Sequence, residues 1–140
     1  MTCLAFPDLL GSVSNVPAHL KYSKAHEWVR VDGDRATVGI TDHAQQELTD
    51  VVFLELPAAG RFVEAGEACA VVESVKTASD IYAPVSGEIV ETNAAVVANP
   101  ALANSDPYGA GWLYRLRLAK AAELAGLLEA DGYRALIGEK

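Results

Sequence analysis

Apolar and polar positions alternate along much of the chain, which is the pattern of β-strands whose sheet has one buried face. The clearest case is a hairpin with strands at residues 26–31 and 35–41, joined by the turn-forming sequence Asp32-Gly33-Asp34. Residues 51–56 form an apolar run that predicts a buried strand. Residues 112–118 alternate apolar with mostly basic residues, which predicts a half-exposed strand.

Two more predicted strands, at residues 68–75 and 81–90, surround Lys76, and the second is interrupted by the turn sequence Pro84-Val85-Ser86-Gly87. Lys76 therefore lies at a turn, where its side chain has no apolar face to cover and projects into water on a stiff mount. A lysine that another enzyme must find and modify needs this geometry. Exposed turn lysines are ordinarily only solvated charges, so the spacing alone does not establish a modification site.

An internal repeat supports this placement of Lys76. Four residues recur 27 positions later, where Pro57, Gly60, Val63 and Glu64 are matched by Pro84, Gly87, Val90 and Glu91. Pro-x-x-Gly is a common turn sequence, so four identities can also arise by chance. Taken as a repeat, they predict two β units related by a quasi-two-fold axis, with a shared core and the connecting hairpin as a protruding tip.

Short helices are predicted around these strands. One ends at Leu48 and is capped by Thr41 or Asp42, with Gln45 three residues after Asp42 in the capping-box position. A single helical turn is predicted at residues 17–21.

Later in the chain, Asn99-Pro100 predicts a helix start. Near the C-terminus the apolar period becomes i, i+3, i+4, which predicts two short amphipathic helices or one broken helix, with Gly132 between the two apolar groups. Together the elements predict a mostly β sandwich with a quasi-two-fold repeat and short peripheral helices, including a C-terminal helical segment.

The domain prediction is one folded unit at residues 15–140, preceded by a flexible N-terminal extension at residues 1–14. That extension has no Lys or Arg, so it lacks the basic start of a secretory signal and the arginines of a mitochondrial transit peptide. A chain of 140 residues buries roughly two thirds of its unfolded surface, so no metal or disulfide is needed for folding.

Charge and residue chemistry exclude several function classes. The formal net charge of -8, without a run of Lys or Arg, argues against nucleic acids and anionic membranes as partners. Cys3 and Cys69 are too few for a disulfide scaffold, so both are predicted to be reduced thiols in a cytosol, with Cys69 in the core. The three histidines, His19, His26 and His43, show no metal-ligand spacing, and no nucleophile–base arrangement is apparent.

Several stretches resemble, in the same order, one known family: the H protein of the glycine cleavage system, a lipoyl carrier. They are Leu20-Lys21-Tyr22, His26-Glu27-Trp28-Val29, Val38-Gly39-Ile40-Thr41-Asp42-His43-Ala44-Gln45, Asp50-Val51-Val52-Phe53, Glu73-Ser74-Val75-Lys76, Ala78-Ser79-Asp80, Ala83-Pro84-Val85-Ser86-Gly87-Glu88, Asn104-Ser105, Pro107-Tyr108 and Gly111-Trp112. The resemblance runs from about residue 15 to the C-terminus and implies the lipoyl-domain fold, a barrel-sandwich hybrid.

The resemblance implies a role for four residues. Lys76 corresponds to the lysine that carries lipoic acid through an amide bond. Glu73 corresponds to a residue recognised by the lipoylating enzyme, and Asp80 to one that contacts the ammonium of the aminomethyl cargo. Glu27 corresponds to a residue that lines the cleft for the arm, where a carboxylate suits a cationic cargo. The resemblance implies no catalytic and no metal-binding residue.

Two positions depart from the family pattern. Ala25 stands where family members often have a hydroxyl residue, and Glu47 stands where some have histidine. Val13 lies close to where family chains begin, which suggests the hypothesis that residues 1–12 are not part of the native protein.

The implied function is non-catalytic transport of the aminomethyl group of glycine within a bacterial cytoplasm. The implied partners are a pyridoxal-phosphate glycine decarboxylase (P protein), a tetrahydrofolate-dependent aminomethyltransferase (T protein) and dihydrolipoyl dehydrogenase (L protein). Lipoyl/octanoyl transferase and lipoyl synthase would install the cofactor. A carrier that presents one tip to several enzymes is most simply a monomer.

Other classes of protein remain as alternatives. Biotin carriers usually have methionine on both sides of their lysine, whereas this chain has Val75 and Thr77. A lipoyl domain of a 2-oxo acid dehydrogenase would normally be followed by a linker and an acyltransferase domain. An interaction module without any carrier role would tolerate loss of Lys76, and donation of lipoyl groups to other carriers is a further possible role.

Overall fold

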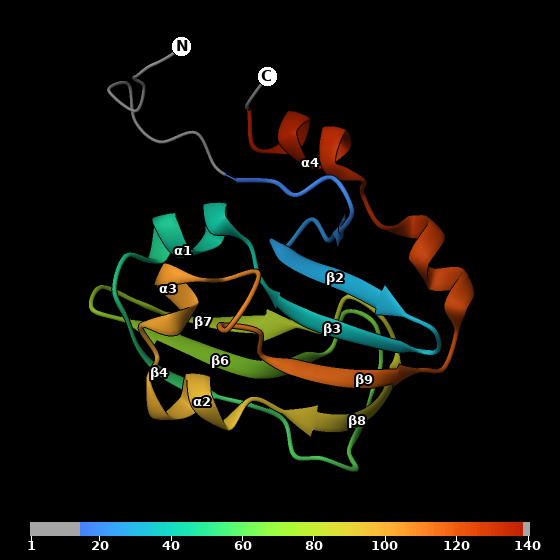
Figure 1. The fold of residues 1–140 in the computed structure, drawn as a ribbon, viewed down its shortest axis with the longest axis horizontal. Helices are drawn as coiled ribbons and strands as arrows, with labels where there is room; N and C mark the ends of the chain where they lie inside the picture. The colour runs from blue at the N-terminus through green and yellow to red at the C-terminus, as the bar shows by residue number, and fades with distance from the viewer. Residues whose placement is uncertain (1–14, 139–140) are drawn as a thin grey trace.

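The computed structural model describes residues 15–138, in which two antiparallel sheets face each other and short helices lie around them (Figure 1). The larger sheet has the strand order β1-β2-β3-β9-β8-β5 and the smaller one β4-β6-β7. The larger sheet consists of β1 (Lys21–Tyr22), β2 (Glu27–Asp32), β3 (Arg35–Ile40), β5 (Phe62–Val63), β8 (Gly87–Thr92) and β9 (Tyr114–Leu118). The smaller consists of β4 (Val51–Glu55), β6 (Ala68–Ser74) and β7 (Ala78–Tyr82). The mostly β sandwich predicted from the sequence is confirmed, whereas the predicted extension at residues 1–14 lies outside the described residues.

The first hairpin forms where the turn sequence predicts it. β2 pairs with β3, with Asp32 opposite Arg35, and Gly33 in the turn has a φ of 66° that glycine adopts without steric cost. The helix that follows, α1 (Asp42–Leu48), is capped by Thr41, whose hydroxyl accepts a hydrogen bond from the Ala44 amide. Thr41 is therefore the correct one of the two candidate caps.

The 27-residue repeat corresponds to equivalent strands. β4 and β7 lie 27 positions apart in the chain and pair with opposite edges of β6, both antiparallel to it. β5 and β8 come from the second half of each repeat and pair with each other in the larger sheet. The hairpin between β6 and β7 contains Lys76 at its turn, as predicted.

Three local predictions need correction. The strand at residues 51–56 is not buried throughout: Val51 and Leu54 face the core, but Val52 and Phe53 are 53% and 46% exposed because the outer face of the smaller sheet is open to solvent. Gln45 does not complete a capping box, because its side-chain amide bonds the Asp42 carboxylate instead of a backbone amide. Instead of the helical turn predicted at residues 17–21, residues 18–19 form a turn, and the chain enters β1 at Lys21.

The later helices also differ in their bounds. The helix expected at Asn99-Pro100 begins two residues further on, as α3 (Leu102–Ser105), and α2 (Ala94–Ala98), capped by the Asn93 side chain, was not predicted. The C-terminal segment is a 3₁₀ helix, η2 (Ala121–Gly126), followed by α4 (Ala130–Leu136). The break lies before α4 and not at Gly132, because Leu128 exchanges two backbone hydrogen bonds with Tyr22.

Two apolar clusters stabilise this arrangement. The main one fills the space between the sheets and includes Cys69, which is buried as predicted. The second lies where α4 (Figure 1) packs beside β1. It includes Trp28 and the stacked rings of Tyr22 and Tyr133, whose centroids are 4.7 Å apart. Within residues 15–138 there is no helix of sufficient length and apolarity to span a membrane.

We predict that Gly87→Ala destabilises the fold by about 2–4 kcal/mol, because a Cβ at Gly87 would lie 2.1 Å from the backbone oxygen of Arg117 on the neighbouring strand. Gly126→Ala is the matched control, since a Cβ there meets nothing within 4 Å. Urea denaturation measures both. Equal stabilities of the two variants would contradict the packing described for β8 and β9.

Candidate functional site

The turn that carries Lys76 is organised by one hydroxyl. The Ser74 oxygen accepts hydrogen bonds from the amides of Lys76 and Thr77, at 3.3 and 3.2 Å. The Ser74 amide donates to the Thr77 carbonyl at 2.7 Å, and the Val75 amide donates to Asp50 in the loop before β4. The backbone on both sides of Lys76 is therefore fixed.

The side chain of Lys76 itself is exposed. Among residues 15–138, no carboxylate lies within ion-pair distance of its ammonium. Both neighbours, Val75 and Thr77, are also exposed, with Val75 at 65%. The structure thus presents an unpaired amine on a rigid turn.

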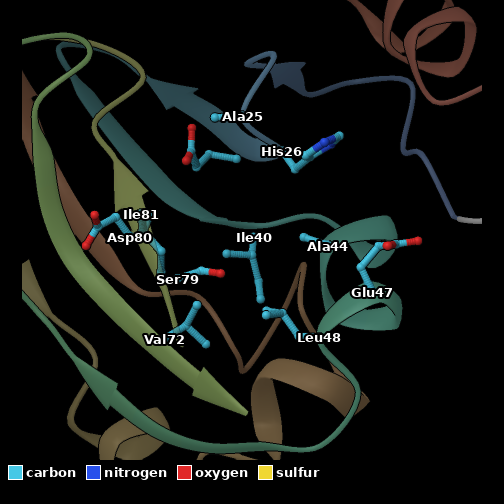
Figure 2. A pocket seen from close by; sticks show the side chains of 11 residues that line it. Ala25, His26, Ile40, Ala44, Glu47, Leu48, Val72, Ser79, Asp80 and Ile81 are labelled. Carbon is cyan, nitrogen blue, oxygen red and sulfur yellow. The ribbon is translucent and has the colours of Figure 1, made fainter. Parts of the chain in front are cut away.

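A pocket of about 220 Å³ lies beside this hairpin, between the two sheets (Figure 2). Its walls come from the β1–β2 loop with the start of β2, from β3 and α1, and from β6 and β7. The lining residues are Ala25, His26, Glu27, Ile40, Ala44, Glu47, Leu48, Val72, Ser79, Asp80 and Ile81. The wall is mostly apolar with a few polar groups, which is the usual composition of a small-molecule site.

The two predicted carboxylates of the Lys76 hairpin, Glu73 on β6 and Asp80 on β7, lie on the face of the smaller sheet that is turned away from the pocket. Val72 pairs with Ser79, and both face the pocket, where Figure 2 shows the Ser79 hydroxyl pointing inward. Because side chains alternate along a strand, the next positions, Glu73 and Asp80, lie on the outer face of the smaller sheet. Asp80 contributes to the pocket rim, but its carboxylate points away from the interior (Figure 2).

Glu27 lies in the pocket wall and is almost completely buried, at 2% exposed. One carboxylate oxygen bonds the Ser23 hydroxyl at 2.5 Å, and the other accepts from the Tyr82 amide at 3.1 Å. Burial raises the pKa of Glu27 above its ordinary value, and the two hydrogen bonds oppose that rise. Since Tyr82 belongs to β7, this carboxylate connects the two sheets across one end of the pocket.

His26 is the site residue that the sequence reasoning did not assign. Its backbone is left-handed, with a φ of 73°, which is uncommon outside glycine. Its ring lies 5.0 Å from that of His43, and its Nδ1 is 2.8 Å from the hydroxyl of Tyr133. Burial and then His43 lower the pKa of His26, while Glu47 opposes the shift, so the neutral imidazole is favoured in this wall.

The comparisons with known proteins show the family of this chain. A model of the family described as "Glycine cleavage H-protein" matches residues 20–140. The chain belongs to the glycine cleavage H-protein family. Its members are carrier components of the glycine cleavage system, so the resemblance found in the sequence is confirmed.

Individual relatives match over nearly their whole length. The glycine cleavage system H protein of Aeromonas salmonicida is 56% identical over 129 residues, which is 91% of this chain and 100% of that protein. That of Aromatoleum aromaticum is 60% identical over 126 residues, 89% of this chain and 98% of the relative. The crystal structure of a glycine cleavage system H protein from Mycobacterium marinum superposes with a TM-score of 0.82 at 45% identity, covering 88% of this chain and 99% of that one.

The structure brings some predicted site residues together and separates others. Glu27 and the two departures from the family pattern, Ala25 and Glu47, all line the same pocket. Glu73 and the carboxylate of Asp80 share the outer face instead. The serine at position 23 and the amide of Tyr82 were missed, because only tertiary contacts reveal that they hold Glu27.

We predict that Glu27→Gln gains stability relative to the unmutated protein as pH rises from 4 to 8. A raised folded pKa means that the native state holds the Glu27 proton more tightly than the unfolded chain does. The contribution of Glu27 to the free energy of unfolding is therefore full below its ordinary value of 4.5 and declines as pH rises through the folded pKa. Glutamine keeps an acceptor for Tyr82 and a donor for Ser23, without the titration. Chemical denaturation at several pH values measures the difference, and a difference independent of pH contradicts the prediction.

Proposed function

We propose that this chain is the lipoyl carrier of a glycine cleavage system and that Lys76 bears lipoic acid as an amide. The observation that carries the proposal is the unpaired, exposed amine of Lys76 at a rigid hairpin tip beside a pocket. Ser79 on the pocket side lies three residues further along the hairpin, at most about 10 Å of extended chain from Lys76. A flexible side-chain adduct of Lys76 can span that separation.

The residues present fit a lipoyl group. The pocket is mostly apolar, which suits a hydrocarbon arm that has lost the lysine charge through amide formation. Glu27, Glu47 and Asp80 are the acidic residues of its lining, which suit a cationic cargo. When bound, lipoic acid supplies a disulfide that accepts the aminomethyl group of glycine and is re-formed by oxidation.

Each residue of the hairpin has a separate proposed task. Ser74 fixes the turn so that the Lys76 amine is presented in one place. Glu73, on the outer face, is suited to recognition by the enzyme that lipoylates Lys76, since that face is open to a docking protein. Asp80 is proposed to contact the ammonium of the cargo along the outer edge of β7, while Glu27 serves inside the pocket and Glu47 at its rim (Figure 2).

The chain is proposed to be a carrier and not a catalyst. Its contribution is to raise the effective concentration of the reactive group at each enzyme that docks, and to keep water away from it between encounters. The proposed enzymes are the glycine decarboxylase, the aminomethyltransferase and dihydrolipoyl dehydrogenase, with lipoyl/octanoyl transferase and lipoyl synthase installing the cofactor. A monomer in the bacterial cytoplasm is the simplest form for this role.

We predict that Lys76→Arg abolishes lipoylation and leaves the fold intact. The protein is produced with lipoate and a competent ligase, and intact-mass spectrometry measures the gain of one lipoyl amide. Lys24→Arg, at another exposed lysine, is the control and should be modified like the unmutated protein. An unmodified wild-type mass, or continued modification of Lys76→Arg, rules the proposal out.

A second prediction concerns the mount of the lysine. Ser74→Ala removes the acceptor for two turn amides and should slow lipoylation several-fold, because the ligase then meets a mobile target. The free energy of unfolding should fall by only about 1 kcal/mol, since the turn is at the surface. Ser74→Thr retains the hydroxyl and should restore the rate. Initial rates of lipoylation with a purified ligase test this. Equal rates for the alanine and threonine variants would show that the hydroxyl that fixes the turn has no effect on lipoylation.

A further inference from the structure

Tyr133 lies on the C-terminal helix α4, more than fifty positions from the Lys76 hairpin in sequence, yet its hydroxyl reaches two elements of the pocket wall. It lies 2.8 Å from Nδ1 of His26 and 2.7 Å from the hydroxyl of Thr41. The tyrosine is fully buried, so these contacts are made in a place that bulk water does not reach. In such surroundings a hydrogen bond is electrostatically stronger than in water, and hydrogen bonds linked in a chain strengthen one another.

The first partner, His26, is part of the pocket wall, and its conformation depends on hydrogen bonds to other residues. Its left-handed backbone is held by a hydrogen bond from its amide to Ser23 and by one from the Thr41 amide to its carbonyl. These bonds fix the main chain but not the imidazole. The contact with Tyr133 sets the ring direction, and the edge-to-face packing of the two rings at 5.7 Å adds to it.

The second partner, Thr41, starts the helix that forms the opposite wall. Its hydroxyl accepts from the Ala44 amide and so caps α1. Ala44, Glu47 and Leu48 of this helix line the pocket. The direction of the Thr41 hydroxyl therefore bears on the position of three lining side chains.

The protons of this network can be assigned without conflict. Thr41 accepts from Ala44 and donates its own proton to Tyr133, and Tyr133 then donates to Nδ1 of a neutral His26. Each hydroxyl proton is used once, and the remaining N–H of the imidazole is on Nε2. The tyrosine hydroxyl thus joins the imidazole and the helix cap in one chain of hydrogen bonds.

We propose that Tyr133 is a positioning residue of the arm pocket, whose hydroxyl holds the His26 imidazole and the start of α1 in the arrangement that shelters the lipoyl arm. The C-terminal helix is then part of the carrier site although none of its residues lines the pocket. This inference rests on the proposed function, because it is the arm that the pocket would shelter.

Tyr133→Phe tests it, with Tyr22→Phe as the matched control. The two rings stack on each other and both are fully buried, but the Tyr22 hydroxyl donates to the Pro17 carbonyl and not to the pocket wall. Each variant keeps its ring, but Tyr133→Phe loses the contacts of its hydroxyl with His26 and Thr41, whereas Tyr22→Phe loses the one with Pro17. Tyr133→Phe should therefore lose at least as much stability as Tyr22→Phe in urea denaturation.

The first measurement uses the lipoylated proteins charged from glycine, and follows the release of ammonia into water without the aminomethyltransferase. We expect release to be at least about fivefold faster for Tyr133→Phe, since loss of a single hydrogen bond from the closed pocket already corresponds to that factor and this variant loses the contacts with both His26 and Thr41. Tyr22→Phe should release at the wild-type rate. Equal rates for Tyr133→Phe and Tyr22→Phe overturn the inference. A wild-type protein that releases ammonia as fast as charged free lipoamide would instead contradict the proposed function.

The second measurement needs no lipoate, and its first part uses only the wild-type protein. The ¹⁵N resonance of His26 Nδ1 in the unmodified wild-type protein, recorded for the neutral ring, should show the shift of a hydrogen-bond acceptor relative to the exposed His19. That shift should disappear in Tyr133→Phe and persist in Tyr22→Phe. A His26 resonance like that of His19 in the wild type overturns the inference even where a variant does not fold.

Discussion

A buried carboxylate sets the relation between the two sheets at the pocket. Removing an ionised group from water costs several kcal/mol unless hydrogen bonds replace its hydration. Glu27 has such replacements, from the Ser23 hydroxyl and from the Tyr82 amide. Tyr82 lies on β7, an edge strand of the smaller sheet. The Glu27 carboxylate therefore accepts a hydrogen bond from a main-chain amide at the edge of that sheet. This bond ties β7, one strand of the Lys76 hairpin, to β2 at one end of the pocket.

The hairpin and the pocket have different kinds of stability. The turn at Lys76 is held mainly by bonds within residues 74–77, with one further bond from the Val75 amide to the Asp50 carbonyl. The pocket instead depends on contacts between segments far apart in sequence, such as His26 with Tyr133 and Glu27 with Tyr82. The proposed carrier role would benefit from this division, since a side chain that is to be modified must be accessible while a pocket that shelters its arm must keep its shape.

Much of the fold follows from patterns that act over short distances. The first hairpin, α1 and the Lys76 turn were predictable, because turn chemistry, capping and alternation are encoded within a few residues. The repeat was predictable from the residues that recur 27 positions later in the chain. In the structure, β4 and β7 accordingly bear the same relation to β6. By contrast, the face occupied by Asp80 depends on which side of β7 is covered, and the role of Tyr133 depends on where α4 docks. Neither is a local property. Likewise α2 was missed, since its Ala-Ala-Val-Val run continues the strand pattern and only the Asn93 cap marks the change.

The stacked aromatic cluster under α4 has a spectroscopic consequence. Trp28 is fully buried there, and its indole N–H bonds the Pro107 carbonyl, whereas the other tryptophan, Trp112, lies in a half-buried position under the guanidinium of Arg115. Indole emission depends on the polarity of the surroundings, so the two fluorophores report different regions of one molecule. We expect the emission at shorter wavelength to come from Trp28 and to report whether the C-terminal helix α4 is docked. Trp28 is therefore an intrinsic fluorescent probe of α4. This helix supports the β1–β2 loop although it lies farthest from that loop in sequence.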